Sequence, residues 1–351
     1  MLLPETLQYH DRERFDFHYI YFLPWKNQMV EEIEKNGGKV TCFSASNNFQ
    51  LMLKVSSIRD YVRANNIQII HCHLPWAGIL GRIVGSFEQI PVVYTEHNKQ
   101  ERYHVVTRLL NLSTMNLLTK VVAVSNDVAE SIRRNKRRLL TPVMTIVNGV
   151  SIEKFDRKLF DGQLIKQQLG IPPSALVIGT IAVFRFQKRL DLWMEIAAQV
   201  LTRYDNVHFI IVGDGPLKKQ LYEKRGELKL ESRIHMPGLQ TEVRPYLAAF
   251  DIYMMTSIFE GLPVALLEAM SMQCPVITTD AGGIKEVVRH EVEGLICSVE
   301  KPTKLIDYAA ELLSGRHSTI EYGNRARMRV EQSFSMRTMV GELESLYNSL
   351  L

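Results

Sequence analysis

Short apolar stretches rich in Val, Ile and aromatic residues alternate along the chain with longer stretches in which apolar residues recur every three or four positions. The first pattern predicts β-strands and the second predicts amphipathic helices. In the first half of the chain, the predicted strands span residues 17–22, 39–43, 67–72, 91–95, 120–124 and 143–147. The clearest predicted helices there span residues 1–10, 26–35, 51–64 and 76–87.

The second half repeats this alternation more clearly. Its predicted strands span residues 177–183, 207–212, 234–236, 251–255, 275–279 and 294–297. Its predicted helices span residues 190–202, 217–228, 243–249, 263–272, 284–288, 303–313 and 335–351. Strands and helices that alternate in this way favour doubly wound parallel sheets, so we expect an α/β fold.

The chain has 351 residues, which is enough for two domains that each bury a core. We expect one Rossmann-like domain over residues 1–149, completed by the helix 335–351, and a second over residues 150–334. The dipeptide Asn148-Gly149 is a turn signal at this boundary.

Composition narrows the class of protein only a little. Charged residues make up 23% of the chain and hydrophobic residues 46%, which is typical of a globular protein. The net charge of +4 is too small to indicate a nucleic acid as partner. The four cysteines form no C-x-x-C pair, so we expect buried, reduced thiols and a cytoplasmic location. No run of about 18 apolar residues predicts a membrane span.

The most informative stretch, residues 256–275, begins where an apolar strand ends and continues into a helix. Glu260 lies in the turn, and Glu268 lies within the helix, eight positions later. Pro263 stands near the first helical position, and Gly261 permits a ligand to approach the backbone closely. Free N–H groups at a helix start bind phosphate, while carboxylates accept hydrogen bonds from hydroxyl groups. A nucleotide sugar combines both kinds of group.

The sequence E-G-L-P-V-A-L-L-E-A-M, followed by P-V-I-T-T-D-A-G-G-I-K-E-V-V, resembles the E-x7-E signature of glycosyltransferase family 4. Further motifs in the same order extend the resemblance over nearly the whole chain. The resemblance implies the GT-B fold, in which two Rossmann-like doubly wound domains face a cleft. It also implies a retaining hexosyltransferase that moves a sugar from a nucleoside diphosphate sugar to a hydroxyl acceptor. Such an acceptor is a glycan or a lipid-linked saccharide, as in surface polysaccharide synthesis.

The same resemblance assigns the donor to the second domain and the acceptor to the first. It gives the ribose hydroxyls to Glu268 and the hydroxyls of the donor sugar to Glu260. The other donor-binding residues that it implies are Gly261, Leu262, Pro263, Val264, Gly213, Gly215 and Leu239. The residues alone permit plainer explanations: the two glutamates as helix caps or ion-pair partners, and Gly213 as part of a tight turn.

Two cations, Arg185 and Lys188, lie where a predicted strand ends and a helix begins. Cations at a helix N-terminus oppose the helix dipole by ~0.3–1 kcal/mol each, unless an anion neutralises both. We therefore expect these residues to clamp a diphosphate, as the resemblance also implies. The family more often carries its Arg five residues before the Lys, where this chain has Val183. A solvated basic turn is the alternative.

His73 and His97 each follow an apolar strand, and ligands of open α/β sheets bind at the carboxyl ends of strands. The resemblance matches His97 to a strand-end histidine at the junction of donor and acceptor, and we expect His73 and Glu96 on the acceptor side. We expect His71 to be a structural histidine that points away from His73. A metal site formed by the three histidines lacks a further Asp or Cys, so we expect no metal.

No D-x-D pair occurs in the chain. Metal-dependent transferases of the other main fold hold a divalent cation with that pair, so its absence favours metal-independent transfer without a cofactor. Three other functions stay open. Two carboxylates also serve glycosidases, although no second acid at a barrel strand end supports that function here. A nucleotide-sugar epimerase shares the fold, and a non-catalytic nucleotide-sugar binding protein or a truncated inactive transferase needs only the donor side.

Residues 1–10 already read as the first helix of a Rossmann-like domain. The first strand and glycine-rich loop that the resemblance implies therefore have no counterpart. Loss of a central strand would leave backbone groups unpaired on both neighbouring strands. We therefore expect a chain start placed too late, at an internal methionine, rather than a true loss.

A basic segment carries five cations within six positions: Arg133, Arg134, Lys136, Arg137 and Arg138. Such a run is usually a solvated face, but it also suits an acceptor on an anionic membrane, at ~1 kcal/mol per cation. The expected partners are a UDP- or GDP-linked donor and a saccharide or lipid-linked acceptor, without nucleic acid. Peripheral contact would then occur at the inner face of the cell membrane.

Overall fold

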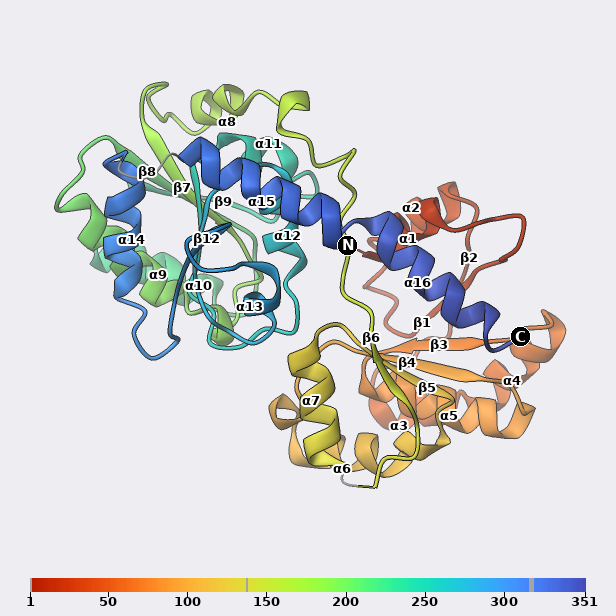
Figure 1. Cartoon of the computed structure of the whole chain (residues 1–351). Coiled ribbons are helices and arrows are strands. Elements are labelled where there is room, and N and C mark those ends of the chain that lie inside the picture. The colour runs from red at the N-terminus through yellow and green to blue at the C-terminus, as the bar shows by residue number, and fades with distance from the viewer. Residues whose placement is uncertain (1, 137, 316–318) are drawn as a thin grey trace. The chain divides into compact units, whose positions relative to one another are not determined.

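The computed structural model describes residues 2–136, 138–315 and 319–351, which form two compact units (Figure 1). Unit 1 comprises Met1–Gly149 with Met336–Leu351, and unit 2 comprises Val150–Ser335. In both units parallel strands alternate with helices. No helix in the described ranges is long and apolar enough to cross a membrane.

Unit 1 distributes its strands over two parallel sheets. A two-stranded sheet pairs β1 (His18–Tyr21) with β2 (Lys39–Cys42). A four-stranded sheet has the order β3 (Ile70–His73), β4 (Val92–Glu96), β5 (Lys120–Ala123) and β6 (Val143–Thr145). Among the described residues, no strand joins the two sheets. The break leaves an unpaired strand edge on each sheet.

Helices cover both sheets of unit 1, and two clusters of apolar residues show how these layers pack. Ile58 and Val84 belong to the first cluster, between α4 and α5. Val93, Val122 and Met339 belong to the second, which joins the four-stranded sheet to α16. The helices are α1 (Leu2–Tyr9), α2 (Val30–Lys35), α3 (Asn48–Met52), α4 (Val55–Ala64), α5 (Pro75–Glu88), α6 (Val105–Thr114), α7 (Asn126–Asn135) and α16 (Met336–Asn348), with the 3₁₀ helices η1 (Gln100–Arg102) and η2 (Met115–Leu117) on either side of α6.

Unit 2 has one six-stranded parallel sheet in the order β12-β11-β10-β7-β8-β9. Numbered within the unit and read from β9, this is the Rossmann order 3-2-1-4-5-6. The order therefore reverses between β7 and β10. The strands are β7 (Leu176–Ile181), β8 (Val207–Val212), β9 (Ile234–Gly238), β10 (Ile252–Met255), β11 (Val276–Thr279) and β12 (Gly294–Cys297).

Apolar residues fill the space between this sheet and its helices, and one cluster of them includes the fully buried Trp193, Phe209 and Met254. The Trp193 indole N–H donates to the Met254 carbonyl at 3.0 Å, so its polar atom is satisfied within the core. The helices of unit 2 are η3 (Arg157–Leu159), α8 (Gly162–Gln168), η4 (Phe186–Lys188), α9 (Leu190–Leu201), α10 (Lys218–Glu227), α11 (Arg244–Ala249), α12 (Val264–Ser271), α13 (Ile284–Val287), α14 (Lys304–Leu313) and α15 (Thr319–Ser333).

Every strand predicted from the sequence has a counterpart in the structure, with shifts at the ends. The largest shift is in β3, which begins at Ile70 instead of residue 67. Asn66 adopts a left-handed conformation with φ 51°, and the Ile67 N–H donates back to the Val62 carbonyl at 3.0 Å. The backbone of Ile67 therefore caps the end of α4 and cannot begin the strand. The helix predicted over residues 51–64 is divided into α3 and α4, with a turn at Leu53.

Candidate active site

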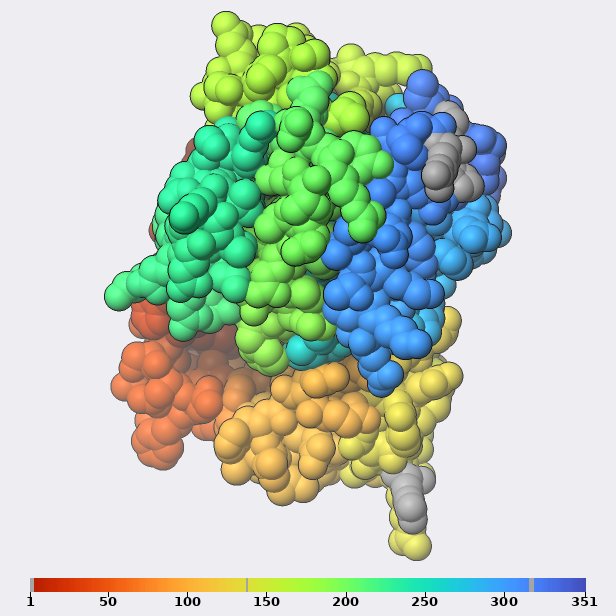
Figure 2. All heavy atoms as spheres, turned by 90° about the vertical axis from the view of Figure 1, so that its left-hand side faces the viewer, coloured from red at the N-terminus to blue at the C-terminus, as the bar shows by residue number. Residues whose placement is uncertain are grey.

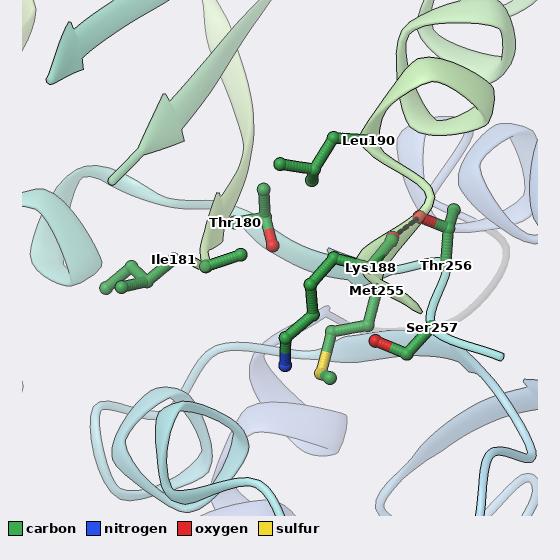
Figure 3. A pocket seen from close by; sticks show the side chains of 8 residues that line it. Thr180, Ile181, Lys188, Leu190, Met255, Thr256 and Ser257 are labelled. Carbon is green, nitrogen blue, oxygen red and sulfur yellow. Dashed lines mark hydrogen bonds between the residues drawn. The ribbon is translucent and has the colours of Figure 1, made fainter. Parts of the chain in front are cut away.

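The carboxyl ends of β7 and β10 lie next to each other at the point where the strand order of unit 2 reverses. Open α/β sheets bind ligands in the crevice outside the strands at such a point. A small pocket opens there, with the Lys188 side chain extending into it (Figure 3). The pocket is lined by Thr180, Ile181 and Ala182 at the end of β7, Lys188 and Leu190 around the start of α9, and Met255, Thr256 and Ser257 at the end of β10.

Lys188 and Glu260 form an ion pair beside this pocket, with 2.5 Å between Nζ and Oε1. Their side chains are only 18% and 12% exposed. The Ser257 hydroxyl donates to the same Glu260 oxygen at 2.6 Å. One cation is thus balanced by one anion, so an anionic ligand of Lys188 has to compete with Glu260.

Hydrogen bonds between the two loops fix the positions of these side chains. The Thr256 hydroxyl donates to the Lys188 carbonyl at 2.7 Å, as the dashed line in Figure 3 marks. The Ile258 N–H donates to the Gln187 carbonyl at 2.9 Å. The loop after β7 and the loop after β10 therefore hold Lys188 and Ser257 in a defined arrangement.

The glycines after β8 allow two loops to pack backbone against backbone. Gly213 has φ 141°, and a Cβ there would lie 1.9 Å from the Ala182 carbonyl oxygen. A Cβ on Gly215 would lie 2.7 Å from the backbone N and O of Phe184. The Gly213 N–H also donates to the carbonyl of Gly238 at the end of β9, at 2.9 Å. Both predicted glycines are thus needed for close packing among the strand-end loops.

The predicted helix after Glu260 is α12, and its first residue is Val264, one position later than predicted. Gly261, Leu262 and Pro263 are buried in the turn before it, and Val264 is half-buried. Glu268 lies in the middle of α12 and is 9% exposed. This burial is unusual for a carboxylate on a helix and indicates specific surroundings.

Tyr253 on β10 links the two carboxylates of the sequence signature. Burial raises the pKa of the Tyr253 phenol above its usual range, and the charges of Glu268 and Glu260 raise it further.

Two predicted donor-site residues point into solvent. Arg185 precedes η4 and is exposed, and its carbonyl accepts from the Lys188 N–H at 3.0 Å. Leu239 follows β9 and is also exposed. The Glu260 carboxylate contacts both Lys188 and Ser257. Arg185 is linked to this group only by the hydrogen bond of its backbone carbonyl.

In unit 1, the structure brings His73 and His97 together at the carboxyl ends of β3 and β4. His73 Nδ1 and His97 Nε2 are 3.0 Å apart, so the N–H of one ring donates a hydrogen bond to the nitrogen of the other. Burial lowers the pKa of His97 to about 4. Burial, followed by the charges of His71 and His97, lowers the pKa of His73 well below its usual range. Both rings are therefore neutral near pH 7.

The expectation that His71 points away from His73 is wrong. Their rings stack with centroids 4.7 Å apart, because residues two positions apart on a strand share a face. His71 Nδ1 lies 2.6 Å from the Tyr347 hydroxyl, and Nε2 lies 2.7 Å from the Thr95 hydroxyl. Burial lowers its pKa to about 3. Among the described residues, no group of three His, Cys, Asp or Glu side chains is arranged to hold a metal ion.

Glu96, predicted on the acceptor side, is the last residue of β4 and is completely buried. Burial raises the pKa of this carboxyl, and the hydrogen bonds that it accepts act in the opposite direction. Contact with a ligand would have to displace one of these donors. The donors are the Asn98 N–H at 3.1 Å, Tyr103 Oη at 2.5 Å, Tyr94 Oη at 2.9 Å, Asn111 Nδ2 at 3.3 Å and Gln100 Nε2.

The basic segment lies at the end of α7 and in the loop that follows. Arg133, Arg134 and Arg138 are exposed, and Lys136 is half-buried. Arg137 lies outside the described residues.

Sequence reasoning missed Ser257 and Thr256, which fix Glu260 and Lys188 by hydrogen bonds. A usable signal was present, because both residues follow directly after β10 at the point where ligands of such sheets bind. Their short hydroxyl side chains are common in loops, so residue type alone did not distinguish them.

Two family models match the chain. The model described as Glycosyltransferase Family 4 matches residues 7–154, and the model described as Glycosyl transferases group 1 matches residues 161–329. The matched ranges together cover most of both units.

Curated relatives extend over most of the chain at low identity. One is UDP-Gal:alpha-D-GlcNAc-diphosphoundecaprenol alpha-1,3-galactosyltransferase of Escherichia coli, which is 25% identical over 84% of this chain and 79% of its own length. Another is N-acetyl-alpha-D-glucosaminyl L-malate synthase of Bacillus anthracis, which is 28% identical over 84% of this chain and 78% of its own length.

Solved structures share the fold of the entire chain. The crystal structure of Anabaena Alr3699/HepE in complex with UDP and glucose superposes with a TM-score of 0.88 over 98% of this chain and 94% of that chain, at 22% identity. The apo form of lipopolysaccharide outer core galactosyltransferase WaaB superposes with a TM-score of 0.72 over 99% and 95%, at 15% identity. The α/β fold of GT-B type is thereby confirmed.

Proposed function

The chain belongs to the glycosyltransferases of family 4, and we propose that it moves a sugar from a nucleoside diphosphate sugar to a hydroxyl group of a glycan or lipid-linked saccharide. In this proposal unit 2 binds the donor and unit 1 binds the acceptor. The two curated relatives described above both carry names of sugar-transferring enzymes, one of them acting on a lipid-linked diphosphate.

The observation that carries the proposal is the Lys188–Glu260 pair, with Ser257, at the strand reversal of unit 2. A diphosphate at this position would bring two negative charges to Lys188, which has one carboxylate partner in the structure. Lys188 would then stabilise the charge that grows on the leaving diphosphate, with Arg185 as a second cation nearby. Glu260 would be released toward the hydroxyls of the donor sugar.

The other donor-site residues have roles that suit their surroundings. Glu268, an acceptor-only group on the buried side of α12, would bind the ribose diol. The turn of Gly261, Leu262, Pro263 and Val264 would present backbone N–H groups to phosphate. The loops of Gly213, Gly215 and Leu239 would lie along the nucleoside. In unit 1, His97, held by His73, would contact the transferred sugar.

We propose that transfer proceeds with retention at the anomeric carbon, without a metal ion or other cofactor. Lys188 and Arg185 supply the positive charge for which other transferases use a divalent cation. Proton NMR of the product tests the stereochemistry through the coupling constant of the new anomeric proton. Activity that persists after treatment with EDTA supports metal independence, and activity that is lost and then restored by a divalent cation refutes it.

The acceptor that we propose is anchored in or near a lipid surface. The exposed cations of the basic segment suit peripheral contact with an anionic membrane. The donor base is either uracil or guanine, and the UDP complex of the similar Anabaena protein makes uracil the first one to test.

The decisive experiment is a calorimetric titration of the chain with UDP and, separately, with GDP. We expect one nucleotide to bind, and we expect Glu268→Ala to weaken binding at least about tenfold through loss of two charge-assisted hydrogen bonds. Glu223→Ala is the matched control, because Glu223 is an exposed carboxylate on another helix of unit 2. A chain that unfolds cooperatively on heating and yet binds neither nucleotide would contradict the proposal.

A further inference from the structure

Helix α6 of unit 1 carries an apolar face that points outward. At 100° per residue, positions 105, 106, 109, 110 and 113 share one side of the helix. Four of these five positions are apolar, their side chains are between 40% and 58% exposed, and the fifth is a serine. A helix on the surface of a domain normally turns charged residues outward. The four apolar residues of this face are Val105, Val106, Leu109 and Leu110.

The opposite side of α6 is fixed by a buried polar anchor. The Arg82 guanidinium on α5 donates to the Asn111 backbone carbonyl at 3.0 Å and to its side-chain oxygen at 2.9 Å. Leu112, next to Asn111, is also buried. Because these contacts hold the helix by its other side, rotation of α6 about its axis cannot hide the apolar face.

The apolar area continues beyond the helix. Leu117 on η2 is exposed, and Leu140 is 83% exposed, the highest value for a large apolar side chain in the described part of the chain. Asn116 brings these residues together, because its side chain donates to the Arg138 carbonyl at 3.3 Å and accepts from the Leu140 N–H at 3.1 Å. The four residues of the α6 face, with Leu117 and Leu140, are named the α6 surface.

Cations surround the α6 surface. The Glu101 carboxylate accepts from Ser131 Oγ at 2.6 Å and from Asn135 Nδ2 at 2.7 Å, which holds the end of α7 beside η1, just before α6. After α7 the chain reaches η2, just after α6, where the Arg138 carbonyl accepts from Asn116; this yellow part of unit 1 lies at the bottom of Figure 2. The described cations at the end of α7 thus lie near η1, and Arg138 lies near η2, at the two ends of α6. Residues 101–140 contain eight Lys or Arg residues and three Asp or Glu residues.

Of these three acids, Asp127 is balanced by an ion pair with Lys99 at 2.8 Å, and Glu101 keeps its charge because Ser131 and Asn135 are neutral partners. The cations still exceed the acids by a wide margin. The positive charge around the α6 surface is therefore largely unbalanced. An apolar face bordered by excess cations is complementary to a layer with apolar chains beneath an anionic surface.

We propose that the α6 surface binds an anionic lipid bilayer, with α6 lying in the interface between head groups and acyl chains. A short apolar face or a cationic rim alone gives weak attachment, whereas the two together give stable, reversible binding. None of the residues of this surface belongs to the donor site of unit 2. Nucleotide binding in solution is therefore independent of lipid binding, and each proposal can fail without the other.

The test is flotation of the full chain with vesicles of phosphatidylcholine that contain about one third phosphatidylglycerol, compared with pure phosphatidylcholine, in about 0.15 M salt. We expect at least about tenfold stronger binding to the anionic vesicles. The double substitution Val106→Ser with Leu109→Ser should weaken this binding about tenfold or more, because both side chains leave the interface. Arg134→Gln with Arg138→Gln should remove the preference for anionic lipid.

The matched control is Leu159→Ser with Leu164→Ser, which removes two exposed leucines from unit 2. It should bind vesicles like the wild type, and all variants should bind the nucleotide alike. A second readout does not depend on loss of binding. In Leu109→Trp, added fluorescence over the three native tryptophans should shift to shorter wavelength with anionic vesicles.

Three results would overturn the proposal. One is a wild type that does not bind anionic vesicles, and another is equal vesicle binding by the wild type and the Val106→Ser, Leu109→Ser variant. The third is concentration-dependent dimerisation of the wild type that this variant abolishes, without vesicle binding. That result would show that a second copy of the chain covers the α6 surface.

Discussion

Unit 2 builds one sheet of six hydrogen-bonded strands, whereas unit 1 divides its strands between two sheets. Both units also bury charged side chains: Lys166, Glu268 and Glu293 in unit 2, and Arg82 and Glu96 in unit 1. Arg82 and Glu96 are both inaccessible to solvent, and both bond to Asn111. An apolar core tolerates exchange of one apolar side chain for another, but a buried polar network depends on each partner. The stability of unit 1 therefore depends on each member of the network that joins Arg82, Asn111 and Glu96.

The two units also differ in how many hydrogen bonds the carboxylates at their strand ends accept. Glu96 in unit 1 accepts hydrogen bonds from five donors, which saturates it. Glu260 in unit 2 contacts Lys188 and Ser257 through a single oxygen, Oε1. A saturated carboxylate stabilises the fold, while a carboxylate with unused acceptor capacity is available to a ligand. Substitutions can test this difference directly.

The largest effect is expected for Glu96→Leu, which removes one acceptor and leaves its donors buried without a partner. We expect unit 1 to lose about 3–5 kcal/mol of stability, since unpaired buried polar groups keep their full desolvation cost. Calorimetry should show an early transition for unit 1 and a later one for unit 2 that UDP shifts upward. Glu96→Gln, which keeps the shape, should cost less. A free energy of unfolding for Glu96→Leu within about 1 kcal/mol of the wild-type value would mean that the network does not stabilise unit 1.

The next effect concerns Lys188 and Glu260. We expect Lys188→Ala to slow transfer about 10²–10³-fold and to weaken nucleotide binding, because the leaving diphosphate loses its cation. Glu260→Gln removes the competing anion, so nucleotide binding should become several-fold tighter, about 3–10-fold, even though transfer slows. Calorimetry and a transfer assay with labelled donor measure the two quantities separately.

The control for this pair is Glu195→Gln, which breaks the ion pair between Lys224 and Glu195, 2.6 Å long, elsewhere in unit 2. It should leave nucleotide binding and transfer unchanged. Weaker nucleotide binding by Glu260→Gln would show that Glu260 positions Lys188 for the phosphates and does not compete with the ligand.

A smaller effect is expected from pH, through His71. Burial, followed by the charges of His97 and His10, lowers its pKa to about 3, against 6.5 in the unfolded chain. Between these values the unfolded state binds the proton and the folded state does not, so stability is lost as the pH falls below about 6.5. We expect unfolding of unit 1 in urea to lose about 2 kcal/mol through His71 between pH 7 and pH 5. Over the same pH range the free energy of unfolding of His71→Gln should fall by about 2 kcal/mol less than that of the wild type. An equal loss in both proteins would exclude His71 as the cause.

The strands of both units could be predicted from the sequence, because buried parallel strands leave continuous apolar runs. All twelve strands in the described part of the chain were found in this way. The long helix α15 (Thr319–Ser333) was missed, since its sequence T-I-E-Y-G-N-R-A-R-M-R-V-E-Q-S is dominated by polar residues and contains a glycine. That glycine, Gly323, lies against the Gln273 backbone, where a Cβ would be 2.3 Å from its carbonyl oxygen. Close packing of backbones requires this residue, and no local pattern reports it.

The candidate site was predictable where the chain itself sets the spacing. Glu260 and Lys188 were predicted from their places next to strand ends and helix starts, and Glu268 from the resemblance to the E-x7-E signature. The direct contact between Lys188 and Glu260 was not, because they are 72 positions apart and only the folded sheet brings them together. The five donors around Glu96 come from a strand, a loop and two helices, so their convergence likewise depends on tertiary packing.

The smallest effect that we predict concerns the pair of His73 and His97. Because both rings are neutral and their nitrogens are 3.0 Å apart, the proton of one ring fixes which nitrogen of the other is free. His73→Asn should therefore lower transfer only about tenfold, through misplacement of His97, while nucleotide affinity and unfolding stay nearly unchanged. The transfer assay is read beside ¹⁵N NMR of His97, whose tautomer should become mixed.

A double-mutant cycle separates positioning from a direct role. If His73 acts only through His97, the double variant of His73→Asn and His97→Asn transfers as slowly as His97→Asn alone. His71→Gln is the control, since it breaks the bonds to Tyr347 and Thr95 but leaves the His73–His97 contact in place. Additive losses in the cycle, or an unchanged tautomer of His97 in His73→Asn, would show that the two histidines act independently. The contact would then stabilise unit 1, as Glu96 does, and only unit 2 would hold polar groups reserved for the reaction.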